Sequence, residues 1–186
     1  IIDKKIRRGT RNMLHEPAMT REEAIQAIEI GITMVKDLVA KGYQVIGTGE
    51  MGIGNTSTSG AIIMCLMGQS AEEVIGKGAG MTETDYRHKK NVLKAAVAKH
   101  RPNPEDPIDV LCKVGGYDIA GIVGIFLGCA YYKIPVVIDG VISITGALVA
   151  SRLNPLSIQY MLPSHLSAEP GYTAVMKELG LSSYLL

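Results

Sequence analysis

Hydrophobic positions follow two patterns along the chain. Some recur every three or four residues, as on one face of a helix, and others form short continuous apolar runs. Thr20 followed by Glu23 is a capping box, which predicts the start of a long helix. That helix is expected to end near Lys41, because Gly42 can adopt the left-handed conformation beyond the last turn. Residues 43–46 then form a short apolar run, which predicts a buried strand.

The rest of the chain repeats this alternation of helix and strand. Asn55 or Thr56 is predicted to cap a following apolar helix that reaches residue 67. Thr82 with Asp85 predicts another capping box, and Asp118 predicts a further N-cap. Together these signals predict helices over residues 82–99, 107–114, 118–131, 143–153 and 173–179, and strands over residues 135–138 and 158–162.

Short apolar strands that alternate with helices are typical of a parallel sheet covered on both faces. We therefore predict an α/β fold, a Rossmann-like parallel sheet flanked by helices, in a single domain of 186 residues. Three strands make a thin sheet with two open edges. The sheet is accordingly expected to be incomplete in this chain and to pair with another subunit or with more polypeptide.

Glycines within the helix predicted over residues 118–131 indicate a close helix contact. Gly121, Gly124 and Gly128 recur at intervals of three and four residues, so they leave one face of the helix nearly bare. Each costs about 1 kcal/mol relative to alanine in a helix. We expect another backbone to approach this face closely.

Composition and charge exclude several classes of protein. Hydrophobic residues make up 47% and charged residues 20%, with a formal net charge of +1, which argues against a disordered chain and against a basic arm that binds nucleic acid. Neither a transmembrane segment nor a signal peptide is evident, so a cytoplasmic location away from membranes is predicted. Cys65, Cys112 and Cys129 form no C-x-x-C pair and are expected to be buried, reduced thiols and not metal or redox ligands.

A glycine-rich loop follows the first predicted strand. Residues 47–52 read G-x-G-x-x-G, as in dinucleotide-binding folds, but that fingerprint also needs an acidic residue after a second strand about 20 positions on. Residues 69–73 there look like the start of a helix. A tight turn is one alternative. The glycines with Asn55 and Thr56 are better explained by a cradle of N–H and hydroxyl groups for one phosphate at a helix N-terminus.

Four side chains are candidates for ligand contact. Glu50, inside the loop, could accept hydrogen bonds from a ligand, cap a neighbouring helix or pair with Lys77. Lys89 lies two turns into a helix, where a lysine is usually solvated. His165 and Glu169 follow a predicted strand end, where open parallel sheets place ligand residues, although a simple turn explains them equally well.

Several long motifs, in the same order, resemble the nicotinate-nucleotide:dimethylbenzimidazole phosphoribosyltransferase family. They lie at residues 11–12, 16–24, 49–56, 76–80, 109–121, 134–140 and 165–171. The resemblance implies transfer of phosphoribose from nicotinate mononucleotide to 5,6-dimethylbenzimidazole, which gives α-ribazole 5′-phosphate and nicotinate, with no metal and no cofactor. A homodimer is the expected assembly.

The resemblance also assigns residues to the site. Glu50 and Lys89 are implied to lie beside the reacting nucleotide, as support for catalysis. Residues implied to surround the phosphoribose are Gly49, Gly52, Gly54, Asn55, Thr56, Gly76, Gly78, Gly80 and Ser167.

The family's general base is a glutamate in a Gly-Glu-Gly loop, and the resemblance implies that this loop follows Leu186. The family's amino-terminal part, which helps to form the base pocket, is also expected outside residues 1–186. The chain is therefore predicted to be a partial α/β nucleotide-binding domain from the middle of a longer enzyme, with little activity alone. The alternatives are a non-catalytic nucleotide-binding module and, less favoured, a nicotinamide-dinucleotide oxidoreductase.

Overall fold

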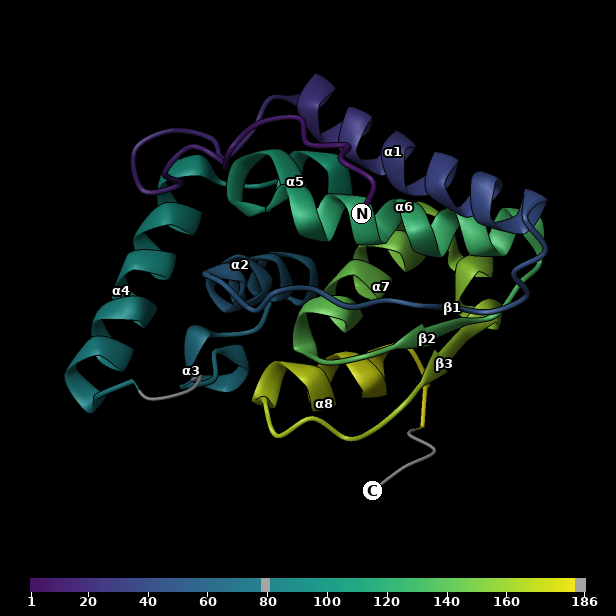
Figure 1. Cartoon of the computed structure of the whole chain (residues 1–186). Helices are drawn as coiled ribbons and strands as arrows, with labels where there is room; N and C mark the ends of the chain where they lie inside the picture. The colour runs from purple at the N-terminus through teal and green to yellow at the C-terminus, as the bar shows by residue number, and fades with distance from the viewer. Residues whose placement is uncertain (78–80, 183–186) are drawn as a thin grey trace.

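A computed structural model describes residues 1–77 and 81–182 of the chain (Figure 1). It shows an α/β fold in which three short parallel strands are flanked by helices, as predicted. The elements in chain order are α1 (Arg21–Ala40), β1 (Ile46–Gly47), α2 (Asn55–Met67), α3 (Ala71–Val74), α4 (Glu83–His100), α5 (Pro107–Val114), α6 (Tyr117–Tyr132), β2 (Val136–Ile138), α7 (Val141–Leu153), the 3-10 helix η1 (Pro155–Tyr160), β3 (Met161–Pro163) and α8 (Pro170–Glu178).

The strands lie in the order β1-β2-β3. Val136 of β2 pairs with Ile46 on one side and with Met161 on the other, which sets the register of the whole sheet. The segments that leave the carboxyl ends of the strands run to the same side of the sheet, toward α2 and α3 (Figure 1). The parallel order therefore gathers the glycine loop, the start of α7 and the segment after β3 in one region.

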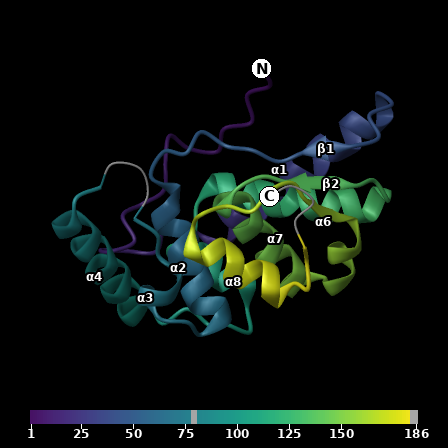
Figure 2. The same cartoon turned by 90° about the horizontal axis from the view of Figure 1, so that it is seen from below.

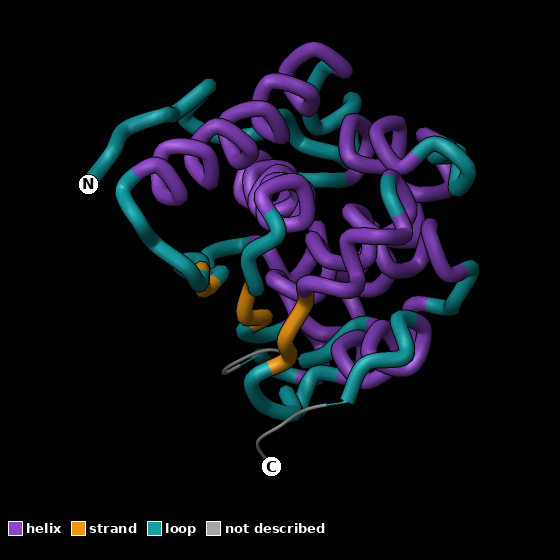
Figure 3. The backbone as a smooth tube through the Cα atoms, turned by 90° about the vertical axis from the view of Figure 1, so that its right-hand side faces the viewer, coloured by secondary structure: helices purple, strands orange, loops and turns teal. Residues whose placement is uncertain are grey.

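Most of the mass is helical, and the strands form a small part of it (Figure 3). Seen from below, α8 lies beside α2, α3 and α7 (Figure 2). The largest fully buried side chains come from many elements and form one continuous core; they include Met19, Ile62, Ile63, Leu111, Phe126, Leu148 and Tyr172. No helix in the described ranges 1–77 and 81–182 has the length and apolar character needed to cross a bilayer.

The glycine face of α6 packs against α1, as predicted. A Cβ at Gly124 would lie 2.8 Å from the carbonyl carbon of Ile28 and 2.9 Å from the Cα of Gly31. A Cβ at Gly31 would lie 2.8 Å from the backbone nitrogen of Ile125. Ordinary carbon contacts are about 3.5–4.0 Å. The two helices can approach this closely only because both positions lack a side chain.

The three cysteines are free thiols, as expected. Cys112 and Cys129 are buried, and Cys65 is partly buried. Burial raises the pKa of the Cys65 and Cys129 thiols to about 12 and that of Cys112 to about 11. These groups are protonated at neutral pH and are poor nucleophiles.

Two predicted strand boundaries are wrong. The first strand covers Ile46–Gly47, and the residues before it, Tyr43 and Val45, are 56% and 53% exposed. The third strand begins only at Met161, because Asn154 caps the 3-10 helix η1 by accepting from the Leu156 N–H. The predicted helices agree with the structure to within three residues at their ends, since most of their caps are local.

The predicted caps of α2 and α6 are also wrong. The N-cap of α2 is Gly54, in the left-handed conformation, and the N-cap of α6 is Gly116. Asn55 and Asp118 lie inside the first turns of these two helices. Their side chains bond to each other instead of capping a helix, with Asn55 Nδ2 2.9 Å from Asp118 Oδ2.

Candidate active site

The candidate site lies where the carboxyl ends of the parallel strands meet the helix N-termini. Thr48, directly after β1, is buried and donates from its hydroxyl to the Val137 carbonyl oxygen at 2.9 Å. It also contacts the Ser143 hydroxyl in the first turn of α7. These bonds fix the start of the glycine loop against the neighbouring strand and helix.

The glycine loop folds back on the carboxylate of Glu50. Gly52 and Gly54 have φ angles of 74° and 73°, which favour glycine. Glu50 Oε2 accepts from the Gly52 backbone N–H and from Asn55 Nδ2, the latter at 2.6 Å. Glu50 does not pair with Lys77, whose ammonium lies 3.4 Å from Glu83. Nor does Glu50 cap α2, because no side chain among the described residues caps the N-terminus of that helix.

Asn55 links Glu50 to a second carboxylate. It is buried, and its amide donates to Glu50 and to Asp118 at 2.6 and 2.9 Å. The other oxygen of Asp118 accepts from the Ile119 backbone N–H at 2.9 Å. The starts of α2 and α6 are thus joined through a chain of three polar side chains.

Lys89 is not solvated, contrary to the expectation from its helical position alone. It is 8% exposed, and its Nζ donates to Thr56 Oγ1 at 3.0 Å and toward the Gly76 carbonyl oxygen at 3.4 Å. Leu93 and Ala96 are buried on the same helix, α4, which packs against α2. Burial lowers the pKa of the Lys89 ammonium, and the charge of Glu169 opposes this shift.

The second glycine cluster meets the segment after β3. Gly76 is buried, and a Cβ there would overlap the carboxylate of Glu169, with Oε1 only 3.0 Å away. Ser167 accepts from the Glu169 backbone N–H at 3.3 Å. Gly78 and Gly80 fall outside the described residues. Thr56, Gly76, Lys89 and Glu169 therefore surround one point, to which the Ser167 segment is joined.

His165 is held by local contacts after β3. Its Nδ1 lies 2.9 Å from the Ser164 hydroxyl, and its ring stacks on Tyr172 with centroids 6.3 Å apart. The Tyr172 hydroxyl donates to the His165 carbonyl oxygen at 2.7 Å. These contacts fix the path of the chain between β3 and α8.

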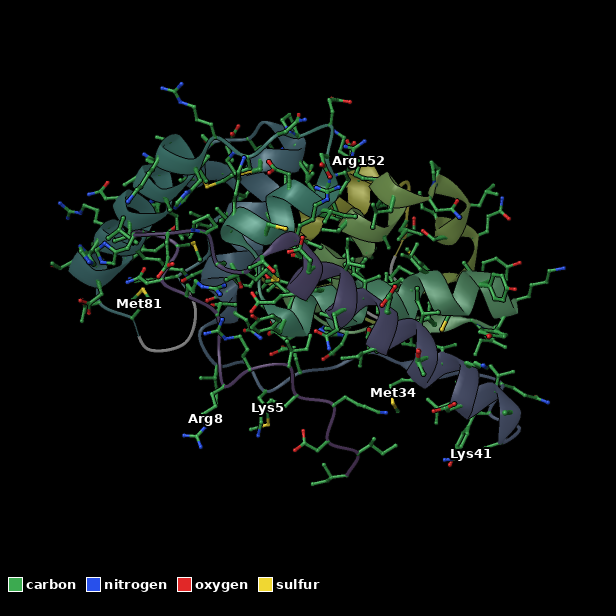
Figure 4. All side chains as sticks on the ribbon, turned by 90° about the horizontal axis from the view of Figure 1, so that it is seen from above. Lys5, Arg8, Met34, Lys41, Met81 and Arg152 are labelled. Carbon is green, nitrogen blue, oxygen red and sulfur yellow. The ribbon has the colours of Figure 1, made fainter. Side chains whose placement is uncertain are left out.

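Two cavities meet at the Asn55 side chain. One, of about 440 Å³, has a mainly apolar wall from α1 and α6 and also contacts Glu50, Asn55 and Asp118. The other, of about 390 Å³, extends from Asn55 and Asp118 to Arg7 and Arg8 of the N-terminal segment. Figure 4 shows Arg8 on this segment, which runs beside α1. In the described part of the chain, no three His, Cys, Asp or Glu side chains converge as metal ligands would.

The chain belongs to the phosphoribosyltransferase family, which matches it over residues 1–186. Curated relatives are nicotinate-nucleotide–dimethylbenzimidazole phosphoribosyltransferases. That of Clostridium acetobutylicum is 55% identical over 185 residues, covering 100% of this chain and 53% of the relative. That of Ruminiclostridium cellulolyticum is 52% identical over 186 residues, with coverage of 100% and 53%. The chain therefore spans about half the length of these relatives.

Solved structures show the same fold. CobT from Thermus thermophilus superposes with a TM-score of 0.93 at 36% identity, covering 99% of this chain and 55% of that one. A second structure, described as the nicotinate-nucleotide-dimethylbenzimidazole phosphoribosyltransferase of the same organism, gives 0.91 at 34% identity, with coverage of 99% and 54%. The family and the fold suggested by the sequence motifs are thereby confirmed.

The dinucleotide-binding alternative is wrong. In that fingerprint, a second strand that ends in an acidic ribose ligand follows the glycine-rich helix. Here α2 is followed by the helix α3 at Ala71–Val74, where that ligand is expected. Glu50 also lies among the glycine N–H groups that would hold a pyrophosphate.

Proposed function

We propose that the chain binds nicotinate mononucleotide and serves the transfer of its phosphoribosyl group to 5,6-dimethylbenzimidazole. The observation that carries the proposal is the buried Lys89 ammonium, held between the first turn of α2 and Gly76. Among the described residues no carboxylate forms an ion pair with Lys89, although the charge of Glu169 acts on it from a greater distance. Burial of a cation without an anion within ion-pair distance is costly. A phosphate beside Thr56 and Gly76 would supply that anion.

The phosphoribose fits the groups around Lys89. The Thr56 hydroxyl and the first turn of α2 supply donors and the positive end of the helix dipole. The nearby Ser167 hydroxyl is a third polar group on the same side. We therefore assign the phosphate to Thr56, Gly76, Lys89 and Ser167, and the ribose to the glycine loop between Gly49 and Gly54.

The Glu50 carboxylate is placed to accept a hydrogen bond from the ribose or the heterocycle. Its Oε2 already accepts from Gly52 and Asn55, so its other oxygen is available. In the reaction the bond from C1′ to the nicotinate nitrogen breaks, a bond from C1′ to the azole nitrogen forms, and the azole loses its proton to a base. Attack from the opposite face converts a β-nucleotide into an α-product.

The apolar cavity beside Glu50 suits the aromatic ring system of the azole. Its volume of about 440 Å³ is in the range of small-molecule sites. We expect the chain by itself to turn over slowly, because it spans about half the length of its relatives and loss of a general base costs at least about 10²-fold in rate. The measurement is formation of α-ribazole 5′-phosphate by this chain and by the full-length Clostridium acetobutylicum relative. Comparable rates would contradict the supporting role of Glu50 and favour it as the base.

Calorimetry with nicotinate mononucleotide tests the binding proposal. Thr56→Ala removes one of the two hydrogen-bond partners of Lys89, and Gly52→Asp puts a carboxylate into the loop at a positive φ that strains any residue with a side chain. Both variants are expected to bind at least about tenfold more weakly, and Glu50→Gln to lose affinity without loss of folding. Unchanged affinity in all three would refute the site. Retained nucleotide binding with no turnover in any chain that includes residues 1–186 would favour the alternative of a non-catalytic binding module.

We further propose that residues 1–186 act as one nucleotide-binding domain of a cytoplasmic homodimer. Among residues 1–77 and 81–182, β1 and β3 are the outer strands of a thin sheet, which supports an additional partner surface. Light scattering during gel filtration tests the assembly, and a single species with the mass of one chain at micromolar concentration would contradict it.

A further inference from the structure

Asp118 is one step away from the proposed nucleotide contact Glu50, through the buried amide of Asn55. Both N–H groups of that amide are used, toward Glu50 at 2.6 Å and toward Asp118 at 2.9 Å. The reverse orientation would point the amide oxygen at two carboxylates. The two acceptors therefore fix which way Asn55 faces.

The unbonded amide oxygen of Asn55 indicates that its side chain serves as a hydrogen-bond donor. Asn55 is 6% exposed, and its Oδ1 has no hydrogen-bond partner among residues 1–77 and 81–182. A buried acceptor without a partner destabilises a fold. If the arrangement served only to stabilise the starts of α2 and α6, nothing would offset this loss of stability. If it holds a carboxylate in one place for a ligand, the loss is explained.

Asp118 has a rigid support. It lies in the first turn of α6, where the helix dipole favours a negative charge, and its Oδ1 accepts from the Ile119 N–H at 2.9 Å. The helix itself packs tightly against α1 through Gly124. Glu50, in contrast, lies on a glycine loop outside any helix. Asn55 is buried, and Asp118, although exposed, is bonded within the first turn of α6, so these two residues are the fixed end of the chain of hydrogen bonds.

The link leaves one oxygen of Glu50 for a ligand. Within the described residues, every hydrogen bond to its carboxylate goes to Oε2. The group is thus held by one oxygen, and Glu50 lines the cavity that it shares with Asn55 and Asp118. We propose that Asp118 is a positioning residue that, through Asn55, orients the Glu50 carboxylate toward the ribose or heterocycle of the bound nucleotide.

This inference rests on the proposed function, and a double-mutant cycle tests it separately. Affinity for nicotinate mononucleotide is measured by calorimetry for Asp118→Ala, Glu50→Ala and the double variant. Loss of a charge-assisted hydrogen bond predicts about tenfold weaker binding for Asp118→Ala. No further loss is expected when Glu50 is already alanine, because Asp118 acts through Glu50. Asp118→Asn, which keeps an acceptor for Asn55, is expected to bind within about threefold of the unaltered chain.

Asp109→Ala is the matched control, since Asp109 is also an acidic residue in the first turn of a helix, α5. It should leave the affinity unchanged. A second readout needs no ligand: the side-chain amide signals of Asn55 in nitrogen–proton spectra should shift in both Asp118→Ala and Glu50→Ala.

Three results would overturn the inference. Equal losses from Asp118→Ala with and without Glu50 would mean that Asp118 acts on stability or on the ligand directly. Unshifted Asn55 amide signals would mean that the link is not formed in solution. Nucleotide binding that Asp118→Ala leaves intact refutes the role of Asp118 alone, whereas no binding by the unaltered chain refutes the proposed function and this role together.

Discussion

The contact between α1 and α6 predicts different effects of alanine at two glycines of α6, because the surroundings of Gly121 and Gly124 differ. A Cβ at Gly124 would lie 2.8 and 2.9 Å from backbone atoms of Ile28 and Gly31, and closer still to the Ile28 carbonyl oxygen. A Cβ at Gly121 would meet only the Ala27 carbonyl oxygen, at 4.0 Å. Alanine is therefore a steric overlap at Gly124 and an ordinary contact at Gly121.

The magnitudes follow from these distances. For Gly124→Ala, the backbones of α1 and α6 must separate by roughly 1 Å to restore ordinary carbon contacts. Overpacking of this kind costs about 1–3 kcal/mol or more, and here the obstacle is backbone that cannot rotate away. The gain of about 1 kcal/mol in helix propensity offsets part of this. We expect a net loss of about 2 kcal/mol for Gly124→Ala and a gain of up to about 1 kcal/mol for Gly121→Ala.

Thermal and urea unfolding of both variants measure the difference. For a chain of this length, about 1 kcal/mol shifts the melting temperature by roughly 2–4 °C. Gly124→Ala should therefore melt about 4–8 °C below the unaltered chain, and Gly121→Ala at or slightly above it. Equal effects of the two substitutions, in either direction, would refute the close packing of α6 on α1.

Three further predictions concern ionisable groups. The Thr20 backbone N–H, Arg11 and Arg7 lower the pKa of Glu23 to about 2. The stabilisation by Glu23 is therefore complete above about pH 4.5 and is lost as the pH falls toward 2. Glu23→Gln should lower the free energy of unfolding by about 1–2 kcal/mol at pH 7 and make it less dependent on pH between 4.5 and 2. Burial lowers the pKa of Lys89, so the unaltered chain should gain stability relative to Lys89→Met as the pH rises toward the unfolded value of 10.5, while Lys89→Met loses nucleotide affinity at every pH. Because the Cys65 and Cys129 thiols have pKa values of about 12, iodoacetamide at pH 8 should label neither before the chain unfolds, as mass spectrometry would show.

The helices could be predicted from the sequence because their signals are local. Thr20 and Glu23 form the capping box within four residues, and Asp106 caps α5 by accepting from the Ile108 and Asp109 N–H groups. The strands are harder, because a strand exists only where a neighbour pairs with it. Tyr43 has the apolar character of a strand residue, yet the ladder starts at Ile46, opposite Val136.

The candidate site was only partly predictable, for the same reason. Glycine loops and their polar residues are visible as motifs, but the bond from Asn55 to Asp118 spans 63 positions and depends on how α2 and α6 start side by side. Both residues look like helix caps in the sequence. The Gly-Gly pair at residues 115–116, separated from Asp118 by one residue, is the signal that could have suggested a helix start without a side-chain cap. The burial of Lys89 could not be predicted either, since the sequence does not reveal which face of α4 packs on α2.

The first turn of α2 lies between the two carboxylates and the ammonium group that the proposed substrate would contact. Consecutive residues of a helix project about 100° apart. Asn55 points to the acidic pair Glu50 and Asp118, whereas Thr56 points to the ammonium of Lys89. A ligand with hydroxyl donors at one end and a phosphate at the other can satisfy both sides only in one orientation. If the phosphate binds as proposed, the same turn therefore also sets which end of the nucleotide faces the apolar cavity, where the azole is proposed to bind.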